Sequence, residues 1–287
     1  ATDFVISINP GGASNRRSTA RSFNGGSDSR RCTPACGYGL ILRDTGVQAE
    51  FSTVTLILFD IDGTLTATNA VDAKCYASAF KKVFGFDLPS TDWDVYTHCT
   101  DRAIIHEAVE KQRGSHAAQA EIDSFEQQFV ADLTVEFSVN PGGFAEIPGA
   151  KRILEAIARR NGFCAALATG GMRGSACYKL SRIGVDAAAM PAGFSNDALT
   201  REDIARHAIA QADGNANDIV YVGDGPWDAR TSAAMGMRFI GITGDAPSDR
   251  LKAEGASVCL ADFLDQEAFF EAVRTAAVPH GRRELSK

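Results

Sequence analysis

The sequence predicts an α/β fold, a doubly wound parallel sheet interrupted by a separate all-helical segment. A buried apolar strand at residues 54–60 is followed by a stretch, 67–146, that has helical spacing and no strand pattern. Strands and helices alternate along the rest of the chain, which is typical of a parallel sheet covered on both faces. Several strands end in turns of Asp, Gly and Thr, where such sheets bind their ligands.

The N-terminal segment, residues 1–52, differs from the rest of the chain. Residues 11–31 are a mixture of Gly, Ser, Asn and Arg, so they bury too little apolar surface to offset chain entropy. They contain no continuous apolar stretch of the kind found in a secretory signal. Their Arg and Ser content is compatible with an organelle transit segment, but acidic residues are present and no amphipathic helix is visible. We expect residues 1–52 to be a disordered extension and 281–287 a C-terminal tail.

The composition is that of an ordinary globular protein, with 45% hydrophobic and 23% charged residues. The net charge of −7 gives no support for a nucleic-acid or membrane-surface partner, and no apolar run reaches the length of a membrane span. Most of the seven cysteines lie in apolar periodic segments, which favours buried reduced thiols over disulfides. Cys32 and Cys36 lack further ligands at metal-binding spacing. These thiols predict a reducing compartment, the cytoplasm.

The inserted segment, residues 68–145, is predicted to be helical throughout. Apolar residues recur there with helical spacing at 69–85, 103–113 and 117–137. The flanking residues, 53–67 and 146–280, are expected to form the core that contains the sheet.

The core is expected to contain further strands at 163–168, 187–192, 218–223, 239–242 and 258–260. Its expected helices are 150–160, 174–183, 201–212, 227–235 and 262–276. Pro148 favours the start of the first of these helices.

Three strand ends carry the residues that predict the chemistry. They are Asp60-Ile61-Asp62-Gly63-Thr64, Thr169-Gly170-Gly171 and Gly223-Asp224-Gly225, with Asp228 shortly after the last. Asp and Gly turns are common at strand ends, so any one of them alone would carry little weight. Because ligands bind beyond the carboxyl ends of the strands, we expect the three segments to form one site.

The two first-strand carboxylates, Asp60 and Asp62, are two residues apart in extended chain and should point the same way. Their mutual repulsion would be relieved by a divalent cation, and Mg²⁺ prefers oxygen ligands of this kind. Asp224 can supply a further carboxylate from a neighbouring strand, and Gly63 lets the backbone turn close to a bulky anion.

The other two segments suit a phosphate group. Thr169 offers a hydroxyl and Gly170 an unobstructed backbone N–H. Arg201, at the start of the helix before the Asp224 strand, could make charge-assisted hydrogen bonds to phosphoryl oxygens. Taken alone, Arg201 is equally well explained as a solvated residue at a helix start.

These residues resemble the haloacid dehalogenase superfamily. The resemblance is strongest at its first motif, Phe59-Asp60-Ile61-Asp62-Gly63-Thr64-Leu65-Thr66, and good at its fourth, Val222-Gly223-Asp224-Gly225-Pro226-Trp227-Asp228. Thr169-Gly170 matches the second motif, and the single basic residue Arg201 is the weakest match, at the third. The resemblance covers residues 54–277 and leaves the N-terminal extension unexplained.

The resemblance implies a Rossmann-like core and a Mg²⁺-dependent phosphatase that acts on a small phosphorylated metabolite. Asp60 would be the nucleophile and form an aspartyl-phosphate, while Asp62 would protonate the leaving oxygen and then activate water. Mg²⁺ would bind Asp60, the backbone carbonyl of Asp62, and Asp224, with Asp228 an outer partner or a ligand through water. Thr169, Gly170 and Arg201 would hold the phosphoryl group.

The same resemblance identifies the insertion 68–145 as a helical C1-type cap, as in phosphoglycolate phosphatase-like members. The loop at 96–102 would then reach the active site and help select the substrate, with His98 and Arg102 as candidate contacts. Thr100 and Asp101 are further candidates, although capping of the helix that follows explains them equally well.

Several alternatives remain open. A phosphomutase of the same superfamily would use the same two carboxylates and a similar cap. A halide-cleaving member would lack Asp62, and a phosphonate-cleaving member would use a cap lysine, for which Lys74, Lys81 and Lys82 are present. A receiver module would be shorter and lack the insertion, a catalytically silent binding protein would not need every motif position filled, and a dinucleotide site would need a different glycine spacing. The substrate and the oligomeric state are not predicted.

Overall fold

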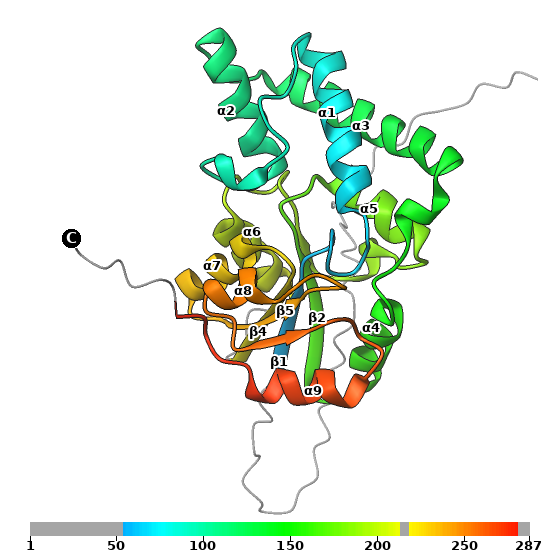
Figure 1. Ribbon diagram of the computed structural model, residues 1–287, viewed down its shortest axis with the longest axis vertical. Helices are drawn as coiled ribbons and strands as arrows, with labels where there is room; N and C mark the ends of the chain where they lie inside the picture. The colour runs from blue at the N-terminus through cyan, green and yellow to red at the C-terminus, as the bar shows by residue number, and fades with distance from the viewer. Residues whose placement is uncertain (1–53, 213–217, 281–287) are drawn as a thin grey trace, which may run out of the picture. The chain divides into compact units, whose positions relative to one another are not determined.

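A computed structural model describes residues 54–212 and 218–280 of the chain (Figure 1). The predictions made for residues 1–52, for Cys32 and Cys36 and for the tail 281–287 therefore lie outside the described residues.

The described residues form one six-stranded sheet in the order β3-β2-β1-β4-β5-β6, with every pairing parallel. The strands are β1 (Thr55–Phe59), β2 (Phe163–Ala168), β3 (Ala192–Gly193), β4 (Asp218–Gly223), β5 (Arg238–Ile242) and β6 (Val258–Leu260). The chain leaves β1 toward β2 and β3, then returns to β4 on the other side of β1. This reversal of strand order is where α/β sheets bind ligands, and it lies between β1 and β4.

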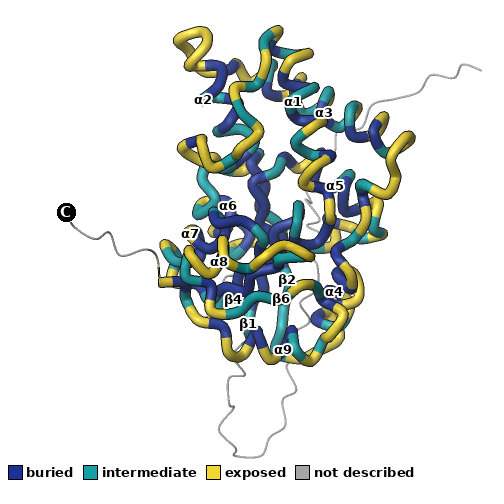
Figure 2. Tube along the Cα trace, viewed as in Figure 1, coloured by how far each residue is buried: buried dark blue, intermediate teal, exposed yellow. Residues whose placement is uncertain are grey.

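Helices cover both faces of the sheet, as predicted. Alternate residues of the central strands, such as Ile57 and Val220, pack with α4, α5 and α9 in one apolar cluster. The residues between them, such as Leu56 and Tyr221, pack with α6, α7 and α8 in another. These helices are α4 (Ala150–Arg159), α5 (Arg173–Arg182), α6 (Arg201–Gln211), α7 (Pro226–Met235), α8 (Asp249–Ala253) and α9 (Gln266–Thr275). Figure 2 shows the buried residues concentrated along the strands between the two helix layers.

The insertion after β1 is helical and contains no strand at residues 67–145, all of which the structure describes. It contains α1 (Asn69–Phe84), η1 (Trp93–Val95), α2 (Asp101–Arg113), α3 (Gln119–Val139) and η2 (Pro141–Phe144). Aromatic rings of α1 and α3 form a separate apolar cluster, in which the centroids of Tyr76 and Phe125 are 4.8 Å apart. The doubly wound α/β fold with an all-helical insertion is thus confirmed.

Two predicted elements differ from the structure. The expected strand at 187–192 is instead the short helix η3 (Ala187–Ala189), followed by the two-residue β3. The Asp186 carboxylate accepts a hydrogen bond from the Ala188 N–H, which stabilises a turn there. The last helix begins at Gln266 rather than 262, because Asp265 caps it by accepting from the Ala268 N–H.

One element was not predicted at all. The short helix α8 lies between β5 and β6. Within the described part of the chain, no helix has both the length and the apolar character needed to cross a bilayer.

Candidate active site

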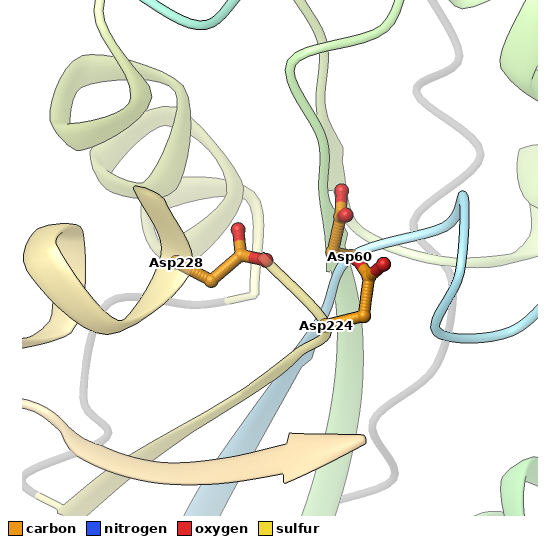
Figure 3. Close-up of side chains that lie close together, drawn as sticks. All are labelled: Asp60, Asp224 and Asp228. Carbon is orange, nitrogen blue, oxygen red and sulfur yellow. The ribbon is translucent and has the colours of Figure 1, made fainter. Parts of the chain in front are cut away.

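Three carboxylates meet at the carboxyl end of the sheet. Asp60 follows β1, Asp224 follows β4, and Asp228 lies in the first turn of α7; one oxygen of each is within 4.8 Å of the others (Figure 3). The register explains this convergence, because Phe59 pairs with Val222 and the Asp60 N–H donates to the Val222 carbonyl at 3.0 Å. The predicted meeting of the first and fourth motifs is therefore present.

Asp60 and Asp224 each keep one buried oxygen without a hydrogen bond. In the described part of the chain, Oδ1 of Asp60 and Oδ1 of Asp224 have no hydrogen-bond donor, although Arg201 Nη1 lies 3.7 Å from Asp60 Oδ1. Burial raises the pKa of Asp60, and Arg201 acts against this rise. Burial, and then the charge of Asp60, raise the pKa of Asp224 to about 7. Buried carboxylate oxygens of this kind fit a divalent cation, which would supply the missing positive charge.

Gly63 lets the loop after β1 pass close to Asp224. Its φ of +77° lies in the left-handed region, and a Cβ there would collide with Asp224 Oδ2. The same Asp224 oxygen accepts a hydrogen bond from Asn69 Nδ2 at 2.9 Å. Both features explain why a glycine is needed beside Asp224, whereas its predicted approach to a bulky anion stays a prediction.

Asp228 is fully buried and is held from two directions. Its Oδ1 accepts from Arg201 Nη1 at 2.6 Å, and its Oδ2 accepts from the Gly225 N–H at 3.0 Å. Arg201 also donates through Nε to the Cys99 carbonyl at 2.9 Å. Asp228 thus fixes the guanidinium of Arg201 beside Asp60.

Thr169 and Gly170, at the end of β2, form the edge of the site next to Arg201. The Thr169 hydroxyl accepts a hydrogen bond from the Gly171 N–H at 3.2 Å. A Cβ on Gly170 would lie 2.6 Å from the Cys99 carbonyl oxygen and 2.8 Å from Arg201 Nη2, so a side chain does not fit there. The three residues predicted to hold a phosphoryl group are therefore neighbours.

Asp62 has a different set of contacts from Asp60. Its Oδ2 is 2.5 Å from Lys179 Nζ, and its Oδ1 accepts from the Thr68 hydroxyl at 2.5 Å. Lys179 lies on α5, and nothing in the sequence motifs singles it out. The one available signal was a charged residue at a helix position flanked by Ala176 and Leu180, which are both buried.

The predicted catalytic and phosphate-binding residues, but neither Asp228 nor Lys179, border a cavity of about 230 Å³. Its acidic lining residues are Asp60, Asp62, Asp72, Asp101 and Asp224, and its basic ones are Arg201 and Arg250. Trp93, Ile104 and Trp227 supply apolar wall. A cavity with this excess of carboxylates needs a cation before it can hold an anionic ester.

The sequence profile that describes haloacid dehalogenase-like hydrolases matches residues 57–242, more than half of the chain. The chain belongs to this hydrolase family. The matched range contains Asp60, Thr169, Arg201 and Asp224, the residues whose convergence is described above.

Solved structures share the fold of this family member. A candidate β-phosphoglucomutase from Bacteroides vulgatus is 20% identical, with a TM-score of 0.56 over 78% of this chain and 90% of that one. A predicted phosphatase from Clostridium acetobutylicum is 17% identical, with a TM-score of 0.54 over 77% and 99%. CbbY from Rhodobacter sphaeroides, in complex with phosphate, is 19% identical, with a TM-score of 0.51 over 74% and 96%. No curated protein sequence matches the chain significantly.

In this haloacid dehalogenase-like hydrolase, a loop of the insertion forms one wall of the cavity. The Thr100 hydroxyl donates to the Leu199 carbonyl at 2.7 Å rather than capping α2, although Thr100 is the N-cap residue. The Asp101 N–H donates to the Gly170 carbonyl at 2.8 Å, and Asp101 Oδ2 accepts from the Met172 N–H at 2.8 Å. The loop therefore contacts the core directly at the predicted phosphate edge.

The two residues predicted for substrate selection, His98 and Arg102, occupy other places in this loop. Arg102 Nη1 donates to the carbonyls of Ser195 and Asn196 at 3.3 and 2.9 Å. His98 borders a neighbouring hollow of about 110 Å³. The loop residues that line the main cavity are Cys99, Thr100 and Asp101.

Proposed function

We propose that the protein is a Mg²⁺-dependent phosphatase that hydrolyses a small phosphomonoester through an aspartyl-phosphate on Asp60. The observation that carries the proposal is the pairing of Asp60 and Asp224 at the sheet edge, where one buried oxygen of each has no donor among the described residues. Thr169, Gly170 and Arg201 lie beside this pair. Catalysis of phosphoryl transfer depends chiefly on such positioning and on neutralisation of charge.

The metal site in this proposal uses oxygen ligands alone. The Asp60 and Asp224 carboxylates and the backbone carbonyl of Asp62 would hold the ion, and Asp228 would act as an outer partner next to Arg201. Bound there, Mg²⁺ would neutralise the phosphoryl charge and relieve the repulsion between the carboxylates.

The reaction would take place in two steps. An oxygen of the Asp60 carboxylate attacks phosphorus, the bond from phosphorus to the ester oxygen breaks, and Asp62 gives its proton to the departing alkoxide. Asp62 then removes a proton from water, the resulting hydroxide attacks the phosphoryl group, and inorganic phosphate leaves with Asp60 regenerated. Thr169, the Gly170 N–H and Arg201 would bind the phosphoryl oxygens in both steps.

Cap lysines do not support cleavage of a phosphonate through a Schiff base. Lys74, Lys81 and Lys82 pair with Glu136, Asp87 and Asp132. Among the described residues that line the cavity, none is a lysine.

The proposal is tested by phosphate release from a panel of sugar phosphates, phosphoglycolate and nucleoside monophosphates, with Mg²⁺ and with a chelator. We expect release from at least one ester, its loss with the chelator, and its loss in Asp60→Asn. Asp62→Asn should keep phosphate affinity while kcat falls by about 10²-fold or more.

Turnover by Asp60→Ala, or full activity in the chelator, would contradict the proposal. An isomerised sugar phosphate in place of free phosphate would instead identify a phosphomutase, which uses the same two carboxylates.

A further inference from the structure

Lys179 is a buried lysine next to the cavity that the two proposed steps leave without a role. Its side chain is only 1% exposed. Its Nζ lies 2.5 Å from Asp62 Oδ2 and 2.6 Å from Asp72 Oδ1. A lysine is rarely buried this completely unless it is paired, and this one is paired with two carboxylates at once.

The two carboxylates belong to different parts of the fold. Asp62 follows β1 in the core, whereas Asp72 lies in the first turn of α1, the first helix of the insertion. Both carboxylates line the cavity, and Lys179 does not. The ammonium group therefore lies behind the cavity wall and joins an acid of the core to an acid of the insertion.

The second oxygen of Asp62 is held by the same region. Its Oδ1 accepts from the hydroxyl of Thr68, the residue that precedes α1, and the Thr66 hydroxyl lies 2.6 Å from that of Thr68. Both oxygens of Asp62 are thus fixed by groups that do not line the cavity. The direction of this carboxyl depends on Lys179 and on the position of α1.

We infer that Lys179 is a positioning residue for proton transfer. It holds Asp62 next to the leaving oxygen and, through its second ion pair with Asp72, makes the orientation of Asp62 depend on the position of α1. This inference rests on the proposed function, because it takes from that proposal the transfer of a proton from Asp62 to the ester oxygen as the phosphorus–oxygen bond breaks. Lys179 itself touches neither the substrate nor the phosphoryl group.

A positioning role of this kind has a signature that a structural role lacks. An alkyl ester leaves as a strongly basic alkoxide and needs the proton from Asp62, whereas an acidic phenol leaves without it. Loss of Lys179 should therefore slow the reaction more as the leaving alcohol becomes more basic. A general disturbance of the fold would slow all esters by the same factor.

The test measures kcat/KM of Lys179→Met with Mg²⁺ for 2,4-dinitrophenyl, 4-nitrophenyl, phenyl and alkyl phosphates. This constant reports the first chemical step, in which the leaving group departs. We expect a loss of about 10²-fold for the alkyl ester and of less than about threefold for the dinitrophenyl ester. In an Asp62→Asn background, Lys179→Met should add no further dependence on the leaving group, because the two residues act on one step.

Two further variants separate the loss of Asp62 positioning from misfolding and from a general effect of removing a lysine. Lys179→Met leaves two partly buried carboxylates without their cation, so Lys179→Met/Asp72→Asn removes the ammonium together with one of them and should give the same leaving-group pattern. Lys74→Met is the matched control, because Lys74 is a 67% exposed residue of α1 that pairs with Glu136. It should leave all the rates unchanged.

An equal loss for every ester in both Lys179 variants, or no loss in either, would overturn the inference. Failure of the wild-type protein to release phosphate from any ester would overturn the proposed function, and the inference with it. The two failures are distinct, since the first requires an active wild-type enzyme.

Discussion

Gly170 lies where the end of β2, the loop of the insertion and Arg201 meet. Its carbonyl accepts from the Asp101 N–H, and its Cα faces both the Cys99 carbonyl and the Arg201 guanidinium. A single added carbon at this position would push apart the groups proposed to hold the phosphoryl oxygens. Positional errors of about 1 Å in such groups can reduce rates by roughly 10²-fold.

Gly170→Ala should therefore lower kcat/KM by about tenfold to 10²-fold. It should also lower the melting temperature, because the nearest atom to the added Cβ is a backbone carbonyl that has to move. Neither Gly170 nor Gly171 has a positive φ, so alanine strains the backbone at neither position. Gly171→Ala is the control, because the atom nearest its added Cβ would be Thr169 Oγ1 at 3.5 Å, an ordinary contact. Equal losses in the two variants would argue against the close packing at Gly170 as the cause.

The residues of the site differ in how readily the sequence predicted them. Asp60 and Asp224 were identified because each ends an apolar strand, and parallel strands bring their ends to one edge. Lys179 and Asp72 lie within helices whose partners become known only when the helices are packed. A sequence shows that Lys179 lies among buried positions of α5, but it does not show which carboxylates approach it.

At the scale of elements, η1 of the insertion is joined to two core helices by ion pairs. Asp94 of η1 contacts Arg230 of α7 at 2.7 Å and Arg250 of α8 at 2.6 Å. Partial burial opposes ionisation of Asp94, but the hydrogen bonds from the two arginines outweigh it and lower the pKa of Asp94. Arg250 also lines the cavity, so this contact lies at its rim.

Asp94→Asn should raise KM several-fold while changing the free energy of unfolding by less than about 1 kcal/mol, because all three side chains are partly exposed. Added salt should raise the KM of the wild type and have less effect on the variant, since it screens the same pairs. Kinetics at low and high ionic strength provide the measurement. An identical salt dependence in both proteins would contradict a role for this contact at the cavity rim.

The elements that the sequence predicted best are those buried most. β1 and β4 lie in the middle of the sheet and are apolar toward both faces, so their pattern is continuous. The edge strand β3 has only two residues, and the alanines before it have little preference for a strand. The short helix α8 has too few residues to show a helical period.

Across the whole molecule, the distribution of charge matters more for function than the net charge of −7. Five carboxylates and two arginines line the cavity, and Lys179 lies behind its wall. In the absence of a cation these carboxylates should destabilise the folded protein. Burial and the neighbouring charge of Asp60 raise the pKa of Asp224 from its ordinary value of 3.8 to about 7, which means that ionised Asp224 destabilises the folded protein.

The raised pKa of Asp224 makes the stability of the folded protein depend on pH. A folded-state pKa above the unfolded value means that the native protein binds the proton more tightly, so stability falls as pH rises from about 3.8 to about 7. At pH 8 in a chelator, Asp224→Asn should therefore melt at a higher temperature than the wild type. Asp123→Asn, which changes an exposed carboxylate of α3 that accepts from Gln119, should not.

With Mg²⁺ present, the wild type should melt at a higher temperature than Asp224→Asn. A ligand that binds only the folded state, present at about 100 times its Kd, stabilises by about 2.7 kcal/mol. The wild type should gain melting temperature with added Mg²⁺, and Asp224→Asn should gain much less. An equal gain in both proteins would place the ion elsewhere.

Transfer of the phosphoryl group to Asp60 is tested by locating that group on the chain. The wild type is mixed with a radiolabelled phosphomonoester and Mg²⁺, quenched with acid within a turnover, digested and analysed by mass spectrometry. We predict label on the peptide that contains Asp60 and none in Asp60→Asn. With 2,4-dinitrophenyl phosphate, whose leaving group needs no proton, label should accumulate in Asp62→Asn, which cannot activate water for the second step. Label on another residue, or turnover with no labelled protein in either the wild type or Asp62→Asn, would contradict the account.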